Sequence, residues 1–216
     1  MKHLKRYNVP KIWGSKRKGT KYLVKPNSNL KTGIPILFIL RDMLNLAQTR
    51  KEVKKAIHMK NLLLNQRLIR DEKNVALLFD VITVIPAKKS YKLTLSENKK
   101  YKLEEVKDKE AETKISKIIN KKILKGKKVQ LNLSDGRNYL SDEKVSMGDS
   151  AVINLKNNKI EGIIKLKEGS KVLVFAGKHT GKIGEIKKIK TERKIAKLKT
   201  EKEEINVLIK QMIAIK

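Results

Sequence analysis

Residues 35–84 read PILFILRDMLNLAQTRKEVKKAIHMKNLLLNQRLIRDEKNVALLFDVITV, and this stretch decides the fold. Over residues 36–47 apolar side chains recur at i, i+4, i+7, i+8 and i+11, which predicts a helix with one apolar face. A second helix is predicted after Thr49, because Thr49 and Glu52 have the spacing of a capping box, which satisfies two backbone donors. An apolar and a basic segment follow over residues 61–70 and indicate a β-hairpin.

Cationic side chains gather on one face of the second predicted helix. Lys51, Lys54, Lys55 and His58 recur at i, i+3, i+4 and i+7, the spacing of a single helical face. Such a run is often plain solvated surface. Here the stretch carries few acids to pair with the cations, and Arg67 adds another cation on the hairpin, so we favour a surface that faces a polyanion.

The composition also indicates a polyanionic partner. The 216 residues include 53 Lys and Arg against 22 Asp and Glu, a net charge of +31, with nucleic acid as the first candidate partner and an anionic membrane as the second. The apolar fraction of 39% supports folded cores, whereas 4% aromatic residues argues against stacking of successive bases. The lack of Cys excludes disulfides and thiolate zinc sites and fits a reducing compartment. No apolar run approaches the ~18 residues of a membrane-spanning helix.

Residues 1–34 show no sustained helical or strand period, and they interleave cations with aromatic residues. A disordered terminus is one interpretation. We favour an extended basic arm with little core of its own, which becomes ordered along phosphates with Trp13 as an anchor. The residues of this arm predicted to contact phosphates are Lys5, Arg6, Lys11, Lys16, Arg17 and Lys18.

Residues 86–167 are predicted to form a mainly β domain. Alternating segments recur at 91–95, 127–133, 150–155 and 159–166, with polar turn residues between them. Residues 104–125 have helical character, with apolar residues mixed among Lys and Glu, so one or two short helices are expected. The apolar residues are Val106, Ile115, Ile118, Ile119 and Ile123.

A glycine loop at residues 177–182 reads GKHTGK and resembles a phosphate-binding P-loop. That pattern needs four residues between its glycines and a Ser or Thr after its Lys, whereas here there are three residues and Ile183 follows. The loop instead resembles a KOW motif, in which a basic glycine loop, an apolar residue and Gly184 lie between two strands; a plain hairpin is the alternative. The side chains expected to reach phosphates from this loop are Lys178, His179, Thr180 and Lys182.

Taken together, these pieces resemble the archaeal and eukaryotic small-subunit ribosomal protein family number four, of the e-type. HLKRYNVPKIW at residues 3–13 is similar to the opening signature of that family, and residues 35–84 resemble its alpha-L RNA-binding motif. KVSMGDSAVINLKNNKIEGIIKLKEGSKVLVFAGKHTGKIGEI at residues 144–186 resembles its central β domain and KOW motif.

The resemblance implies an α+β, multi-module fold. Its expected parts are a basic N-terminal arm at 1–34, an alpha-L helix-helix-hairpin module at 35–85, a β-rich domain at 86–167 and a small SH3-like KOW barrel at 168–216. The hairpin turn of this family usually carries Asp-Gly or Asn-Gly. Gln66 replaces that glycine here, so we expect a longer or looser turn.

The resemblance also implies a function: a structural constituent of the small ribosomal subunit in the cytoplasm. Its partners would be small-subunit ribosomal RNA and neighbouring ribosomal proteins, with no cofactor, metal, membrane or small-molecule substrate. The side chains that the alpha-L module would present to RNA are Arg41, Lys51, Lys54, Lys55, Asn65 and Arg67.

Two other functions remain open from the residues alone. An RNA-modifying enzyme is one, because alpha-L modules also accompany catalytic domains. His3, His58 and His179 lie far apart among cations, however, and Asp80 is expected to end a strand or cap a turn. The second is a general nucleic-acid-binding protein that compacts DNA, or a membrane-surface protein. DNA compaction would predict equal affinity for DNA and RNA duplexes, and membrane docking would need a helix with a wide apolar face open to solvent.

Overall fold

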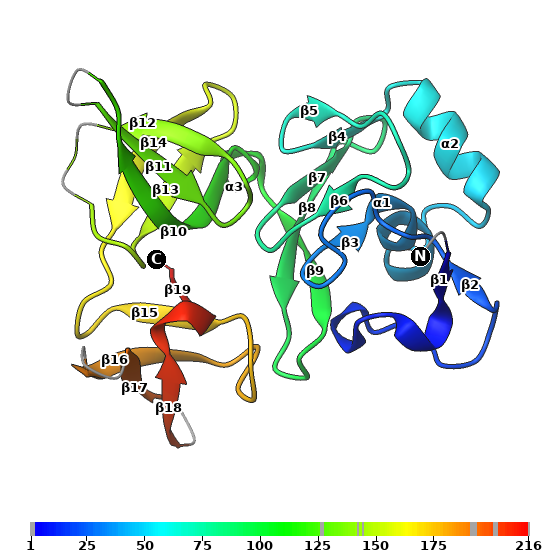
Figure 1. The fold of residues 1–216 in the computed structure, drawn as a ribbon. Helices are drawn as coiled ribbons and strands as arrows, with labels where there is room; N and C mark the ends of the chain where they lie inside the picture. Colours follow the sequence, from blue (N-terminus) through cyan, green and yellow to red (C-terminus); the bar gives the residue numbers. More distant parts are fainter. Residues whose placement is uncertain are drawn as a thin grey trace. The chain divides into compact units, whose positions relative to one another are not determined.

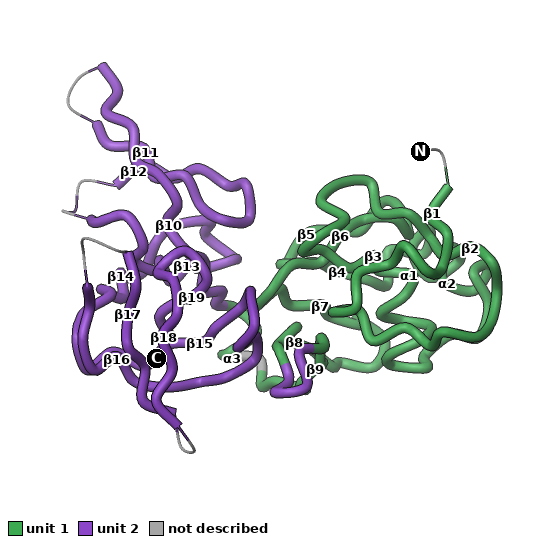
Figure 2. Tube along the Cα trace, turned by 60° about the horizontal axis from the view of Figure 1, so that its bottom comes forward, with its two compact units in different colours: residues 1–95, 100–112 green, residues 96–99, 113–216 purple. Residues whose placement is uncertain are grey.

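The computed structural model describes residues 3–125, 128–141, 143, 145–190, 194–200 and 203–215 (Figure 1). The chain divides into two compact units (Figure 2): unit 1 comprises residues 1–95 and 100–112, and unit 2 comprises residues 96–99 and 113–216. Strands dominate and helices are few. The expected α+β class is therefore confirmed only as a mainly β fold with a few short helices. Within the described part of the chain, no helix is long and apolar enough to cross a membrane.

Unit 1 is built on a five-stranded antiparallel sheet of order β5-β4-β7-β8-β9 (Figure 1). Its strands are β4 Leu62–Leu64, β5 Arg67–Leu68, β7 Val81–Val84, β8 Lys89–Leu95 and β9 Tyr101–Val106. The pairing of β7 with β8 crosses the boundary expected between residues 85 and 86. The hairpin and the strands that follow it therefore form one sheet rather than parts of two domains.

The first helix is shorter than expected and is buried on every side. α1, Ile36–Phe38, continues into a π-helical turn, Ile39–Met43, and Asn45 then adopts a positive φ of 54°. Five consecutive apolar residues, 36–40, are buried, so the helix inserts into the core instead of lying on it with one face. Next to it, β3, Ile34–Pro35, pairs with β6, Val75–Ala76.

The second helix forms as predicted. α2, Arg50–His58, begins after Thr49, whose hydroxyl accepts a hydrogen bond from Glu52 N at 3.3 Å. The Glu52 carboxylate in turn accepts from Gln48 N at 2.8 Å, which lowers the pKa of Glu52. The apolar face of α2 is buried at Val53 and Ile57, and its cationic face is exposed.

The N-terminal segment is folded, which corrects the expectation of an extended arm. β1, Leu4–Lys5, pairs with β2, Tyr22–Leu23, and two 3₁₀ turns, Arg6–Asn8 and Lys11–Trp13, lie between them. Trp13 is only 2% exposed. Its Nε1 donates to the carbonyl of Gly33 at 2.9 Å, and its ring centroid lies 5.6 Å from that of Phe38. The assignment of Trp13 as an RNA anchor is therefore wrong, because the indole is part of the core.

Arg6 also has a role inside the protein. Its Nε donates to the Thr20 carbonyl at 2.7 Å, its Nη1 to the Lys16 carbonyl at 2.8 Å and its Nη2 to the Thr20 hydroxyl at 2.8 Å. Three donors of one guanidinium thus hold residues 16–20 in place. Arg6 orders the loop that carries the cations Lys16, Arg17 and Lys18, rather than simply adding one more cation to it.

The first sheet of unit 2 corrects the expected helices at residues 104–125. α3, Asp108–Ala111, is a single helical turn, and β10, Thr113–Ile123, is a strand of 11 residues. The β-branched residues of β10 favour a strand. The first half of β10 pairs with β13 and the second half with β11, and a bulge follows Ile118. The sheet has the order β12-β11-β10-β13-β14, with β11 Val129–Leu133, β12 Asn138–Ser141, β13 Ser150–Asn154 and β14 Lys159–Ile164.

The second sheet of unit 2 has the order β18-β17-β16-β15-β19 and is antiparallel throughout. Its strands are β15 Lys171–Val174, β16 Ile183–Lys190, β17 Ile195–Lys199, β18 Glu204–Leu208 and β19 Met212–Ala214, with a 3₁₀ turn at Ile209–Gln211. Alternate residues such as Val172, Ile186 and Leu198 fill one apolar core.

Lys117 links the two sheets within unit 2. Its Nζ donates to the carbonyls of Ile209 and Met212, the latter at 2.8 Å, and burial lowers the pKa of Lys117 to about 8. Nearby, Ala214 N donates to the Ser150 hydroxyl at 3.0 Å. β10 and β13 are therefore bonded to the segment that ends in β19.

The hairpin turn at Asn65-Gln66 is tight, which corrects the expectation of a looser one. Leu64 pairs directly with Arg67, and the two turn residues have φ values of 52° and 63°. A two-residue turn with both residues left-handed is the type that usually selects Asn-Gly. Gln66 adopts this conformation at a steric cost that glycine would not have.

Replacing Gln66 by glycine is expected to raise the free energy of unfolding of unit 1 by about 0.5–1 kcal/mol, since relief of strain exceeds the added entropy of the unfolded chain. Trp13 is the only tryptophan and is buried in unit 1, so its fluorescence during urea unfolding isolates this unit. The control, Gln66→Ala, keeps a Cβ and should show no such gain. If Gln66→Gly were no more stable than Gln66→Ala, the strain would be contradicted.

Candidate nucleic-acid interface

The exposed face of α2 is the densest cationic feature that the sequence predicted. Lys51, Lys54, Lys55 and His58 are all exposed, and they project from a helix whose opposite face is fixed in the core. Lys54 Nζ lies 4.0 Å from the Glu72 carboxylate, yet the Lys54 side chain remains 48% exposed. These cations form a rigid ridge that faces solvent.

A buried carboxylate, which the sequence analysis missed, holds the start of this helix. Glu72 is 5% exposed and accepts a hydrogen bond from Arg50 Nε at 3.0 Å, and a second Arg50 nitrogen also contacts it. The backbone carbonyl of Glu72 accepts from Leu37 N at 3.0 Å. Glu72 thereby joins α1 and α2, and no local sequence pattern indicated a pair 22 residues apart.

Asn65 has a structural role, which corrects its assignment as an RNA contact. It is 4% exposed; its Nδ2 donates to Asp80 at 2.9 Å, and its Oδ1 accepts from Val81 N at 3.0 Å. Asp80 also accepts from Leu77 N at 2.7 Å, so it caps a turn as expected. Arg67, in contrast, is exposed on the hairpin next to this network.

The remaining predicted cations of unit 1 have different surroundings. Lys5, Lys11, Lys16, Arg17 and Lys18 are exposed. Arg41, whose side chain is 29% exposed, forms an ion pair with its neighbour Asp42 at 2.8 Å.

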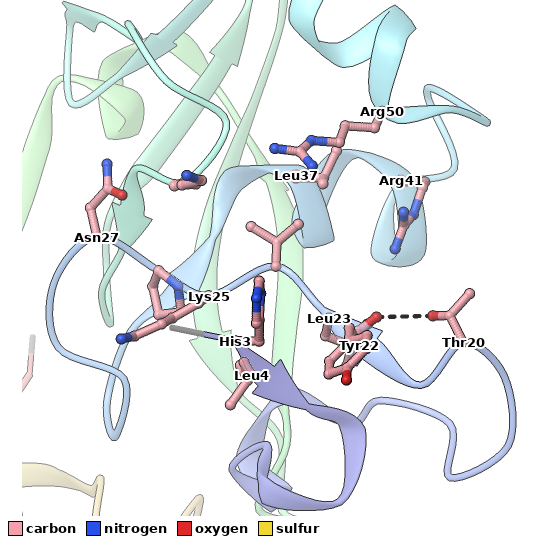
Figure 3. Close-up of a pocket in the computed structure, with 13 residues that line it drawn as sticks. His3, Leu4, Thr20, Tyr22, Leu23, Lys25, Asn27, Leu37, Arg41 and Arg50 are labelled. Atoms are coloured by element: carbon pink, nitrogen blue, oxygen red, sulfur yellow. Dashed lines mark hydrogen bonds between the residues drawn. The ribbon is translucent and has the colours of Figure 1, made fainter. Parts of the chain in front are cut away.

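A cavity of about 660 Å³, also unforeseen, lies in unit 1 between the N-terminal segment and the two helices (Figure 3). Cations, two rings and apolar side chains line it together. Its charged and aromatic lining residues are His3, Tyr22, Lys25, Arg41, Arg50 and Lys73. Sequence periodicity could not reveal this cavity, because its walls come from distant segments that only the fold brings together.

The glycine loop at residues 177–182 in unit 2 is a turn between strands. Gly177 and Gly181 have φ values of 91° and 90°, as the motif requires. The hydroxyl of Thr180 donates to the Gly177 carbonyl at 2.7 Å, and Thr180 is only 7% exposed, so it closes the loop instead of reaching outward. Lys178 is exposed, and His179 is half-buried.

Lys182, the last predicted residue of this loop, forms an ion pair with Glu203 that precedes β18. The hydrogen bond and charge of Lys182 lower the pKa of Glu203. The loop therefore offers Lys178, part of His179 and the ion-paired Lys182 to solvent. Among the residues that the structure describes, no cluster of three or more His, Asp or Glu could hold a metal ion.

The fold and its cations together define a basic, β-rich protein with one rigid cationic helix face and a cation-lined cavity. Comparison with known proteins identifies the family to which a protein of this class belongs. The ribosomal family S4e matches residues 87–160. Small ribosomal subunit protein eS4 of Archaeoglobus fulgidus is 37% identical over 196 residues, which cover 90% of this chain and 83% of that protein. The protein of the same name from Methanocella arvoryzae is 34% identical over 197 residues, again covering 90% and 83%.

The fold has a solved counterpart as well. The crystal structure of the 30S ribosomal protein S4e from Thermoplasma acidophilum matches with a TM-score of 0.74 at 24% identity, covering 86% of this chain and 95% of that one. The chain belongs to the ribosomal protein S4e family.

Proposed function

We propose that this protein is a structural constituent of the small ribosomal subunit in the cytoplasm and binds ribosomal RNA there. Membership of a family of structural ribosomal proteins supports this role and makes the protein a non-enzyme. The single observation that carries RNA binding is the exposed cationic face of α2 on a helix locked at its start by a capping box. The net charge of +31 makes a polyanion the natural partner.

The proposed modules follow the chain order. Residues 35–85 act as an alpha-L RNA-binding module, supported by two helices followed by a tight hairpin. Residues 168–216 act as a KOW module with an SH3-like barrel, supported by a five-stranded antiparallel sheet with a glycine loop between its strands β15 and β16. Residues 1–34 supply a folded basic N-terminal segment. The central β region expected at 86–167 begins as a separate sheet at β10, because residues 89–106 extend the sheet of the hairpin.

Binding would rest on two terms. Lys and Arg displace counterions from RNA phosphates, which makes the affinity fall as salt rises. Because the major groove of A-form RNA is too narrow to read, shape and 2′-hydroxyl contacts would select RNA over DNA. Neighbouring ribosomal proteins are the other proposed partners. Exposed apolar side chains of unit 2 support such contacts: Ile119, Ile123, Leu140 and Met147.

Replacing Lys54 and Lys55 together by alanine is expected to weaken binding to transcribed small-subunit ribosomal RNA. The slope of log K against log salt should flatten by up to ~2, about 1 for each lost phosphate contact. Titrations over a range of salt concentrations measure both quantities. The matched control replaces Lys159 and Lys165, two exposed lysines of unit 2, by alanine. The control and the Lys54/Lys55 variant then have the same net charge. An equal loss in both variants would show that only total charge matters.

Sedimentation tests the proposed role directly. In a cell lysate on a sucrose gradient, the protein should migrate with small-subunit particles at low salt and remain there until salt strips ribosomal proteins generally. Recovery of the free protein at low salt would reject the proposal. With the purified protein, competition between RNA and DNA duplexes should favour RNA; equal competition would indicate a general nucleic-acid-binding protein.

A further inference from the structure

The cavity of unit 1 has a chemistry that the helix face lacks. Its volume of about 660 Å³ lies within the range of small-ligand pockets, ~300–1,000 Å³. Among the described residues that line it, none is acidic, although the chain contains 22 carboxylate side chains. Its charged lining side chains are therefore basic, although Arg41 and Arg50 each pair with an acid outside the lining. An anion with an apolar or aromatic part is the ligand that fits this lining.

One wall of the cavity is aromatic and apolar (Figure 3). The rings of His3 and Tyr22 lie 5.6 Å apart and are tilted by 52°, and Tyr22 is 47% exposed. The buried side chains of Leu23 and Leu37 also line the cavity. A planar base gains by stacking on such rings, and stacking tolerates any base because each has a π face.

Another part of the lining is cationic. Arg41 and Arg50 come from the two helical segments (Figure 3). Lys73 comes from the turn that follows Glu72. Arg41 pairs with Asp42, and Arg50 pairs with Glu72. Each guanidinium has five N–H donors, so these ion pairs leave donors for a phosphate. Bidentate binding by arginine is well matched to phosphate oxygens.

Hydrogen bonds hold the walls in place before any ligand arrives. The Thr20 hydroxyl donates to the Tyr22 carbonyl at 3.1 Å and accepts from Arg6, which fixes the loop before β2. Asn27 is bonded twice: its backbone N donates to the Lys73 carbonyl at 3.1 Å, and its Nδ2 donates to Asp71 at 3.1 Å. A preformed site does not have to order its side chains on binding.

We propose that this cavity receives one unstacked nucleotide of the bound RNA. The base stacks on the partly exposed ring of Tyr22 beside His3, and the phosphate is held by Arg41 and Arg50. This inference rests on the proposed RNA-binding function and adds a ligand class, a bulged or looped-out nucleotide, to the shape recognition of paired RNA. The low aromatic content of the chain is compatible with this role, because a single nucleotide needs one exposed ring rather than a row of rings.

The experiment uses the full-length protein, one fully paired RNA stem-loop and four bulged stem-loops. Each bulged stem-loop differs from the paired one by a single unpaired nucleotide, and each carries a different base at the bulge. The wild-type protein should bind at least one bulged stem about tenfold more tightly than the paired stem. Tyr22→Ala and Arg41→Ala should each bring this ratio close to one, whereas Tyr22→Phe should keep it. In a bulge that carries 2-aminopurine, the fluorescence should change on binding to wild type and not to Tyr22→Ala.

The lysine variant of α2 separates failure of this site from failure of RNA binding. Replacement of Lys54 and Lys55 should lower the affinity for both stems and leave their ratio unchanged. A wild-type ratio near one for all four bases, with both stems bound, would overturn the cavity proposal alone. Failure to bind either stem at low salt would overturn RNA binding and the cavity proposal together. A ratio that Tyr22→Ala leaves intact would place the bulge elsewhere on the protein.

Discussion

Replacing Trp13 by alanine is expected to destabilise unit 1 by about 3–5 kcal/mol, the usual cost of deleting a fully buried large aromatic side chain. The indole is 2% exposed, packs on Phe38 and bonds to the Gly33 carbonyl, so its loss creates a cavity and leaves that carbonyl without its donor. Because the variant has no tryptophan, amide hydrogen exchange of β1 and β2 is the appropriate measurement. Protection there should fall most.

Trp13→Phe provides the control for this prediction. Phenylalanine retains one buried aromatic ring but loses the Nε1 bond and part of the indole volume, so the cost should be smaller than for alanine, about 1–3 kcal/mol. The alanine variant should also weaken RNA binding, because the N-terminal cations would no longer be held in place. Unchanged protection of β1 and β2 in Trp13→Ala would mean that the N-terminal segment folds independently of the core.

The N-terminal segment shows what the sequence could not predict. Trp13 lies among cations and glycines without any period, and periodicity is the signal that marks a core residue. The indole contacts Gly33 and Phe38, which are distant in the sequence. Cations next to aromatic residues suggested an RNA contact, although here the ring completes the core.

Sequence patterns were reliable where a feature depends only on residues close together in the chain. The capping box at Thr49 and Glu52, the buried face of α2 and the positive φ of Gly177 all follow from residues within one turn or one loop. The isoleucines of β10 failed as a signal because β-branched residues at spacings of three and four fit a helix and a bulged strand alike. Cross-strand partners decided between them, and a single sequence does not contain that information.

The candidate site divides in the same way. The lysines of α2 were predictable because helical spacing alone places them on one face. Asn65 and Thr180 were predicted to face RNA, yet each turns inward to satisfy a backbone group of its own surroundings. Short polar side chains at turns often do so. The cavity required the fold itself, since the segments at residues 3, 22, 41 and 73 meet only in three dimensions.

Replacing Asp135 by asparagine is expected to destabilise unit 2 by about 3 kcal/mol or more, because it removes the charge that compensates a buried ammonium. Lys114 Nζ donates to Asp135 Oδ2 at 2.7 Å, and their side chains are only 2% and 5% exposed. Arg137 adds a backbone N–H bond to the same carboxylate at 3.1 Å. Hydrogen exchange of β10 and β11 reports the loss within unit 2.

The pH dependence of this loss has a definite sign. Burial alone would raise the pKa of Asp135, but the charge and hydrogen bond of Lys114, with Arg137, outweigh it and keep the pKa below its ordinary value. A carboxyl whose folded pKa is depressed stabilises the protein above the unfolded pKa, and this contribution disappears as pH falls through the folded pKa. The stability difference between wild type and Asp135→Asn should therefore be constant near neutral pH and shrink below pH ~4.

The double variant Asp135→Leu with Lys114→Met tests whether the stability of unit 2 depends on the charges of this ion pair or on the volume that its side chains fill. Replacing both partners by apolar side chains removes the desolvation cost together with the attraction, so it should recover at least half of the lost stability. A double variant as unstable as the single one would mean that Lys114 and Asp135 act through their other hydrogen bonds. A difference that does not shrink on acidification would show that the Asp135 charge contributes nothing.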